Sequence, residues 1–159
     1  MDQDKQQPDN TPTPLESRHE AERLGAVVKF NALLNRIAES PLSRVELRDG
    51  YIEVLVKSAV GRHDGATYSL AAGIKGGERD SSDSWLAMHR RQSSRARVEY
   101  LSLRVERGGV SGSYAPDVIN TPYDEFMDFE ASRADVEDFQ GMLENQGIIQ
   151  KEESDLEQL

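Results

Sequence analysis

Cysteine is absent from the 159 residues of this chain, which excludes disulfide bonds, cysteine-ligated zinc sites and thiol catalysis. Histidine occurs three times, at His19, His63 and His89, and no two of these stand at the spacing of a helical metal-binding pair. The amino terminus lacks the basic-then-apolar pattern of a signal peptide, and no apolar run approaches the roughly 20 residues needed to cross a bilayer. These absences predict a cytoplasmic protein that holds no cofactor and no metal.

Basic residues are fewer than acidic ones, and the imbalance is concentrated near the carboxyl end. The chain has 29 Asp and Glu against 19 Lys and Arg, which gives a net charge of −10. Residues 117–159 hold thirteen acids and two basic residues, whereas residues 85–107 hold six arginines and two acids. The overall charge disfavours nucleic acid and anionic lipid and favours a partner protein with a basic surface. The alternative is an acidic surface that serves only solubility.

Hydrophobic periodicity predicts one α+β domain over 14–149, between a disordered tail, 1–13, and an acidic tail, 150–159. A main helix is expected over 15–40. Its apolar stripe is read as Leu24, Val27, Val28, Asn31, Leu34 and Ile37, widened by Phe30 and Leu33. Apolar and polar residues alternate on both sides of Asp49-Gly50 and of Gly108-Gly109, which predicts hairpins over 43–57 and 97–115. A strand over 66–72, a short helix over 84–92 and a helix over 134–145 complete the pattern.

The expected fold is an antiparallel sheet of about five strands in the order α-β-β-β-α-β-β-α, with helices packed mainly on one face. This order of elements resembles that of small secretion chaperones and of some toxin-immunity proteins. The resemblance is one of element order alone, and a shared fold does not by itself specify a function.

Motifs with catalytic meaning are incomplete in this chain. Gly73–Glu78 is glycine-rich but lacks the Gly-Lys-Ser/Thr ending of a phosphate-binding loop. Gly109–Ser113 has a serine where the second glycine of a nucleophile elbow is required. An enzyme would have to rely on His63 with Asp64 and Asp80, near the glycine-rich loop.

Two segments that flank the second hairpin are the candidate recognition surfaces. Arginines gather over 90–97, and an acidic-aromatic segment runs over 123–129, as in docking peptides. The predicted partner-binding residues are Asp117, Tyr123, Asp124, Glu125, Phe126, Asp128, Phe129, Glu130, Arg90, Arg91 and Arg95. The alternatives are that the arginines pair internally with the acids and that the aromatic residues belong to the core. The hairpin is expected to be scaffold, with Arg104 and Glu106 as a secondary surface, and 110–114 would accept an added strand if it formed an edge.

The sequence thus favours a non-catalytic, acidic protein-binding module of the immunity, inhibitor or secretion-chaperone kind. Two alternatives remain open. One is a structural or accessory subunit of a larger assembly such as a phage or a secretion machine, and the other is a small hydrolase-type enzyme. The expected partner is another protein, not nucleic acid or a membrane, and the sequence leaves the oligomeric state open.

Overall fold

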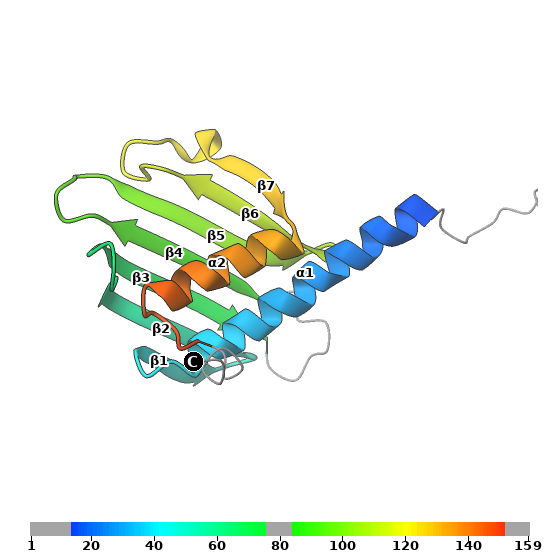
Figure 1. The fold of residues 1–159 in the computed structure, drawn as a ribbon, viewed down its shortest axis with the longest axis horizontal. Helices are drawn as coiled ribbons and strands as arrows, with labels where there is room; N and C mark the ends of the chain where they lie inside the picture. Colours follow the sequence, from blue (N-terminus) through cyan, green and yellow to red (C-terminus); the bar gives the residue numbers. More distant parts are fainter. Residues whose placement is uncertain (1–13, 76–83, 152–159) are drawn as a thin grey trace, which may run out of the picture.

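The computed structural model describes residues 14–75 and 84–151, with side chains from Arg18 onward. Helix α1 (Pro14–Ala38) is followed by seven strands and then by helix α2 (Arg133–Asn145) (Figure 1). The strands are β1 (Ser43–Arg48), β2 (Tyr51–Val60), β3 (Thr67–Ile74), β4 (Trp85–Arg91), β5 (Val98–Glu106), β6 (Gly109–Ala115) and β7 (Met127–Ala131), with a 3-10 turn, η2 (Tyr123–Glu125), before β7. The predicted tail 1–13, residues 152–159 of the predicted acidic tail, and Asp80 lie outside the described residues.

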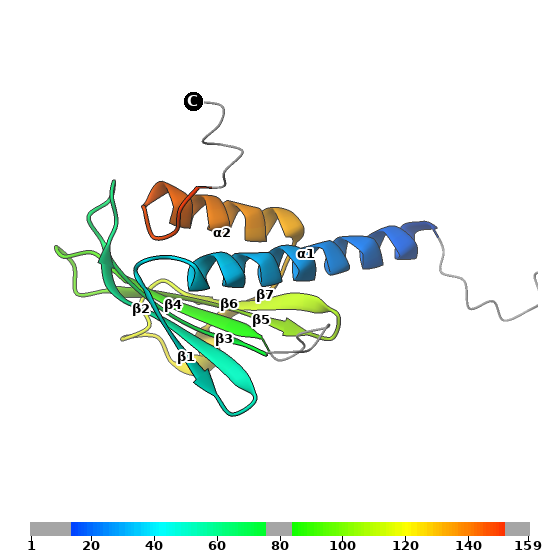
Figure 2. The same cartoon turned by 90° about the horizontal axis from the view of Figure 1, so that it is seen from below.

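The seven strands form one antiparallel sheet in which each strand lies beside its neighbours in the sequence, from β1 at one edge to β7 at the other. Both helices lie side by side on one face of this sheet (Figure 1, Figure 2). The α+β class and the antiparallel sheet are therefore confirmed, but the expected count of about five strands is wrong. Within the described ranges, neither helix is long and apolar enough to cross a membrane.

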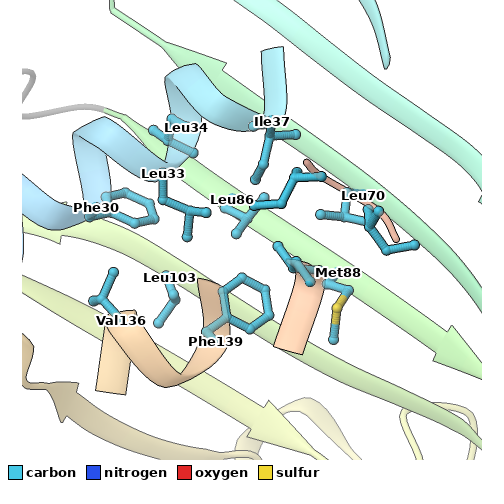
Figure 3. Close-up of a cluster of buried hydrophobic side chains, with 14 of the residues drawn as sticks. Phe30, Leu33, Leu34, Ile37, Leu70, Leu86, Met88, Leu103, Val136 and Phe139 are labelled. Atoms are coloured by element: carbon cyan, nitrogen blue, oxygen red, sulfur yellow. The ribbon is translucent and has the colours of Figure 1, made fainter. Parts of the chain in front are cut away.

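The core lies between the two helices and the sheet (Figure 3). Helix α1 contributes Phe30, Leu33, Leu34 and Ile37, helix α2 contributes Val136 and Phe139, and the sheet contributes Leu70, Leu86, Met88 and Leu103. Apolar side chains from the helix layer and from the sheet thus meet along one face of the sheet, and burying this surface is the main stabilising term of the fold.

The segment predicted as a short helix over 84–92 is strand β4. Its residues pair with β3 from Gly73 opposite Trp85 to Thr67 opposite Arg91. Leu, Ala, Met and Arg favour helices intrinsically. Leu86 and Met88, however, are both buried, and burial of every second residue is the pattern of a strand. Pairing with β3 and β5 on both sides overrides the local preference. The order that resembled secretion chaperones and immunity proteins is therefore not the order of this chain.

The apolar stripe of α1 also differs from the expectation. Leu24 and Val28 are each 60% exposed, whereas the buried stripe consists of Ala26, Val27, Phe30, Leu33, Leu34 and Ile37. At 3.6 residues per turn, Leu24 lies about a third of a turn away from Phe30 around the helix axis. The stripe that faces the sheet and α2 is thus rotated away from Leu24 and Val28.

Strand β7 was not expected, and it changes the role of β6. Residues 127–131 pair with β6 from Tyr114 opposite Met127 to Val110 opposite Ala131. The segment 110–114 is therefore an inner strand and not an edge open to strand addition. The edges of the described sheet are β1 and β7.

Helix α2 begins and ends with local hydrogen bonds that its sequence specifies. Ser132 Oγ accepts from the Asp135 N–H at 3.0 Å, and the Asp135 carboxylate accepts from the Ser132 N–H at 2.9 Å, which is a capping box. After Gly147, at φ +79°, the chain turns back and buries Ile148 and Ile149 against the core. This return anchors the second helix over the sheet.

Candidate functional site

A hollow of about 490 Å³ opens on the face of the sheet that the helices leave free, over β5, β6 and β7. The strands supply most of its lining, and η2 with the residue after it supplies the rest. The lining residues are Tyr100, Ser102, Arg104, Glu106, Ser111, Gly112, Ser113, Tyr123, Phe126, Asp128 and Phe129. We call this site the outer hollow.

Short serine side chains form the floor of the outer hollow. Strand register places Ser102 of β5 opposite Ser113 of β6, and Arg104 opposite Ser111. These residues face away from the core because they alternate with buried residues such as Leu103. A serine rises only a short way above the sheet, so the floor stays low and presents hydroxyl groups that donate and accept hydrogen bonds.

Aromatic rings form one wall of the outer hollow. The Phe126 ring lies 5.6 Å from the Tyr100 ring and 5.4 Å from the Tyr123 ring, in the second case edge-on. His89 continues the row, with its ring centroid 5.0 Å from that of Tyr100. The turn η2 sets this geometry, since the Phe126 N–H donates to the Tyr123 carbonyl at 3.2 Å. Tyr123 stands at the end of the row with 78% of its surface exposed.

The one arginine among the lining residues is already paired. Arg104 Nε lies 3.3 Å from a carboxylate oxygen of Glu106, on the same strand and the same face. A hydrogen bond from Ser111, and after it the one from Arg104, holds the pKa of Glu106 below its usual range. The positive charge in the outer hollow is thus offset by a stable carboxylate.

Three further carboxylates beside the outer hollow have no cationic partner among the residues that the structure describes. Asp124 and Glu125 lie on η2, and Asp128 lines the outer hollow from β7; all three are exposed. Across the described part of the chain, none of the three forms an ion pair. We call them the acidic rim. Of the three, only Asp128 is a lining residue; Asp124 and Glu125 follow Tyr123 on η2. Together the three charges make the potential around the outer hollow more negative.

The structure brings most of the predicted acidic-aromatic residues to this one place. Those that line the outer hollow or form its acidic rim are Tyr123, Asp124, Glu125, Phe126, Asp128 and Phe129. Glu130 instead forms an ion pair with Arg23 of α1, at 2.8 Å. Asp117 is not among the lining residues of the outer hollow. It accepts a hydrogen bond from the Asn120 amide at 2.8 Å, and this bond is the largest cause of its lowered pKa.

The predicted arginine cluster is divided between the two faces of the sheet. Arg90 lies on the helix side, where it pairs with Asp64 at 3.1 Å and Glu99 at 2.9 Å. Burial opposes its charge, but hydrogen bonds to Tyr68 and to the two carboxylates outweigh that and raise its pKa. Arg91 points to the opposite face because consecutive strand residues alternate.

Arg95 lies in the loop after β4 and lines a smaller hollow of about 170 Å³. That hollow also contains Arg90, Arg97 and Glu99, so it is on the helix side of the sheet and separate from the outer hollow. The arginines of 90–97 therefore do not all lie on one surface, and Arg90 and Arg95 lie apart from the outer hollow.

Of the residues considered for catalysis, Asp64 is engaged through its side chain and His63 through its backbone N–H. Asp64 accepts hydrogen bonds from the Tyr68 hydroxyl at 2.5 Å, from the Ala66 N–H at 2.9 Å and from Arg90. The side chain of Gln146 accepts from the backbone N–H groups of both His63 and Asp64. Among the residues that the structure describes, no three His, Asp or Glu side chains gather closely enough to hold a metal ion.

Tyr100 and the serines of the outer hollow were not among the predicted site residues. Their signal was present, since Tyr100, Ser102, Arg104 and Glu106 occupy alternate positions of one strand and share its exposed face. What the sequence does not show is that η2 folds beside that face. Because η2 packs beside it, this solvent-exposed face of the sheet becomes a hollow.

Chemically, the outer hollow suits a cation held against aromatic faces and carboxylates, with hydroxyl groups available for hydrogen bonds. Comparison of the chain with protein-family models, with curated proteins and with solved structures found no match.

Proposed function

We propose that this chain is a non-catalytic binding module that masks or escorts a partner protein by taking a basic segment of it into the outer hollow. The observation that carries this proposal is the pairing of an aromatic wall with an acidic rim that has no cationic partner in the described residues. The net charge of −10 supports it, because a negative protein steers a basic partner toward itself over long range.

The chemistry of the wall favours a guanidinium or an ammonium group. A cation within about 6 Å of an aromatic ring is attracted by the negative face of that ring, and arginine stacks on such rings more often than lysine. Tyr123 and Phe126 line the outer hollow together with Asp128 of the acidic rim. An arginine side chain of the partner would contact both kinds of group at once.

The size of the outer hollow suits a short segment. Its volume of about 490 Å³ falls in the range that holds a few side chains. The serine floor supports the backbone of an extended segment, since Ser102, Ser111 and Ser113 carry hydroxyl groups on the open face.

The decisive experiment uses the full chain to capture partners from an extract of its native host, followed by binding kinetics with the purified partner. Affinity is expected to fall as salt rises, because screening weakens the attraction. The triple variant Asp124→Asn, Glu125→Gln, Asp128→Asn is expected to slow association at least about tenfold. The matched control is Glu20→Gln, Glu22→Gln, Glu39→Gln, which removes the same charge from exposed positions on and just after α1 and is expected to leave association close to wild type.

A second variant tests the aromatic wall separately. Tyr123→Ala removes an exposed ring, and it is expected to weaken binding about threefold to thirtyfold, the range of one cation–π contact. Leu24→Ala, which trims an exposed apolar side chain on α1, is the control. Equal effects of the two charge triples, salt-independent binding, or failure to recover any basic partner would each overturn the proposal.

A further inference from the structure

Strand β1 is an edge of the sheet that carries apolar side chains into solvent. It pairs with β2 on one side, and among the described residues nothing pairs with its other side. Leu47 is 84% exposed, Val45 is 47% exposed, and Leu42 just before the strand is 49% exposed. Soluble proteins usually protect such an edge, because its free N–H and C=O groups and apolar side chains invite another strand.

The helix layer does not cover this edge. Val45 and Leu47 lie opposite Val54 and Ile52 of β2, which places them on the helix side of the sheet. Figure 2 shows that the hairpin of β1 and β2 bends away from the helices toward its tip. The apolar side of β1 therefore stays open, although its inner neighbour Val54 is buried beneath the helices.

A second copy of this chain fits the edge in a defined way. Two identical antiparallel strands related by a two-fold axis must place one residue opposite its own copy, because residues that face each other across such a pair point to the same side. If that residue is Val45, then Arg44 of each copy faces Glu46 of the other. If it is Glu46, then glutamate faces glutamate and Arg44 faces Arg48, which repels.

The other edge of the sheet gives the opposite result. Centring β7 on Phe129 would place Asp128 of each copy against Glu130 of the other, so like charges would meet twice. Charge complementarity thus selects β1 over β7. We propose that two copies of this chain pair through β1, antiparallel and about a two-fold axis at Val45, into one continuous sheet.

The two-fold axis of such a pair stands perpendicular to the sheet. Both helix layers therefore lie on one side of the joined sheet, and both outer hollows open on the other side. The dimer leaves each outer hollow accessible, and it is independent of what the outer hollow binds.

The test begins with the mass of the full chain by light scattering, from low micromolar to near millimolar concentration. The mass is expected to rise from 17.8 kDa toward twice that value. Val45→Lys places two like charges at the axis and is expected to keep the mass at 17.8 kDa throughout. Val60→Lys, at an exposed valine on the end of β2, is the matched control and is expected to dimerise as the wild type does.

Because the chain has no cysteine, a single introduced thiol reports the register directly. With Val45 at the axis, Val45→Cys places two Cα atoms about 4.5–5.5 Å apart, within the range of a disulfide. Mild oxidation is therefore expected to cross-link two copies. Leu47→Cys should not cross-link, since in this register its Cα atoms are about 14 Å apart.

A third pair of variants tests the charges. Glu46→Arg places like charges opposite Arg44 of the second copy and is expected to abolish the dimer, whereas Arg44→Glu combined with Glu46→Arg is expected to restore it. A constant mass of 17.8 kDa at every concentration would overturn the proposal. So would a dimer that survives Val45→Lys, cross-linking through Leu47→Cys in place of Val45→Cys, or an edge that pairs only with a different captured protein.

Discussion

The ring of Phe129 lies directly against the backbone of Gly112. A Cβ built at Gly112 would stand 2.7 Å from both Cε atoms of that ring and closer still to Cζ. The two residues face each other across β6 and β7, so the ring covers the position where a side chain would otherwise stand. Gly112 thereby makes room for an aromatic ring, as other strand glycines do.

Gly112→Ala is expected to lower the free energy of unfolding by about 1–3 kcal/mol, the usual cost of overpacking. Urea unfolding measures this loss. The double variant with Phe129→Ala is expected to be less destabilised than the sum of the two single variants, because the methyl group then has space. Gly141→Ala in α2 is the control: a Cβ there meets nothing within 4 Å, so it is expected to stabilise the helix by up to about 1 kcal/mol. Additive effects of the first two substitutions would contradict this account.

Arg90→Met is expected to destabilise the fold by about 2–3 kcal/mol, because it leaves Asp64 and Glu99 without their shared cation under the helix layer. The loss of stability is smaller than that for a fully buried ion pair because all three side chains are partly exposed. Arg133→Met is the comparison. It breaks only the exposed ion pair between Arg133 and Glu137, one helical turn apart, and such a pair contributes about 0.5 kcal/mol. Similar losses in the two variants would show that the Arg90 network is no more than a surface contact.

Asp64→Asn is expected to reduce the acid sensitivity of the fold. Burial raises the pKa of Asp64. Hydrogen bonds from Tyr68, from the Ala66 N–H and from Arg90 together lower this pKa by more than burial raises it, so the net shift is downward. A folded pKa below the unfolded one stabilises the protein above about pH 4, and this stabilisation is lost as the pH falls through the folded pKa. Urea unfolding at a series of pH values from 7 to 2 measures it. Asp128→Asn, at the acidic rim, controls for the change of net charge, and parallel acid profiles for wild type and Asp64→Asn would count against the prediction.

Two tyrosines are expected to ionise late. Burial first, and then a hydrogen bond to a carboxylate, raises the pKa of Tyr68 and of Tyr114 to about 12; the carboxylates are those of Asp64 and Glu99. Because the folded pKa exceeds the unfolded one, this stabilisation is complete below about pH 10 and is lost as the pH rises through 12. Tyrosinate absorbance should show a late phase that loses amplitude in Tyr68→Phe and again in Tyr114→Phe. An unchanged late phase in both variants would disprove the assignment.

The helices and the two hairpins follow from local patterns, and the sequence was sufficient to predict them. Alternation around Gly50 and Gly108 marks real turns, since both have positive φ. Strand β4 was missed because Leu86, Ala87 and Met88 prefer helices, and only pairing with β3 and β5 makes them a strand. Strand β7 was missed because its acids are poor strand formers, and β6 supplies the pairing that holds them.

The candidate site was half predictable for a similar reason. The acidic-aromatic segment stands out in the sequence by composition, and six of its residues do meet at the outer hollow or its rim. The serine floor and Tyr100 depend on which strand faces lie side by side, and that follows from register across β5, β6 and β7. Arg90 and Arg91 point to opposite faces of the sheet because β4 is a strand. The prediction of a helix over 84–92 therefore could not show that these two arginines are separated.

The chain-order sheet has a consequence for how the protein is made. Each strand pairs with the next one along the sequence, so the sheet can grow hairpin by hairpin as the chain leaves the ribosome. The helices are different: Arg36 of α1 reaches Glu144 of α2 across 108 residues. All seven strands precede α2, so until α2 is synthesised part of the apolar face of the sheet lacks its cover, and the nascent chain is most prone to aggregate at that stage.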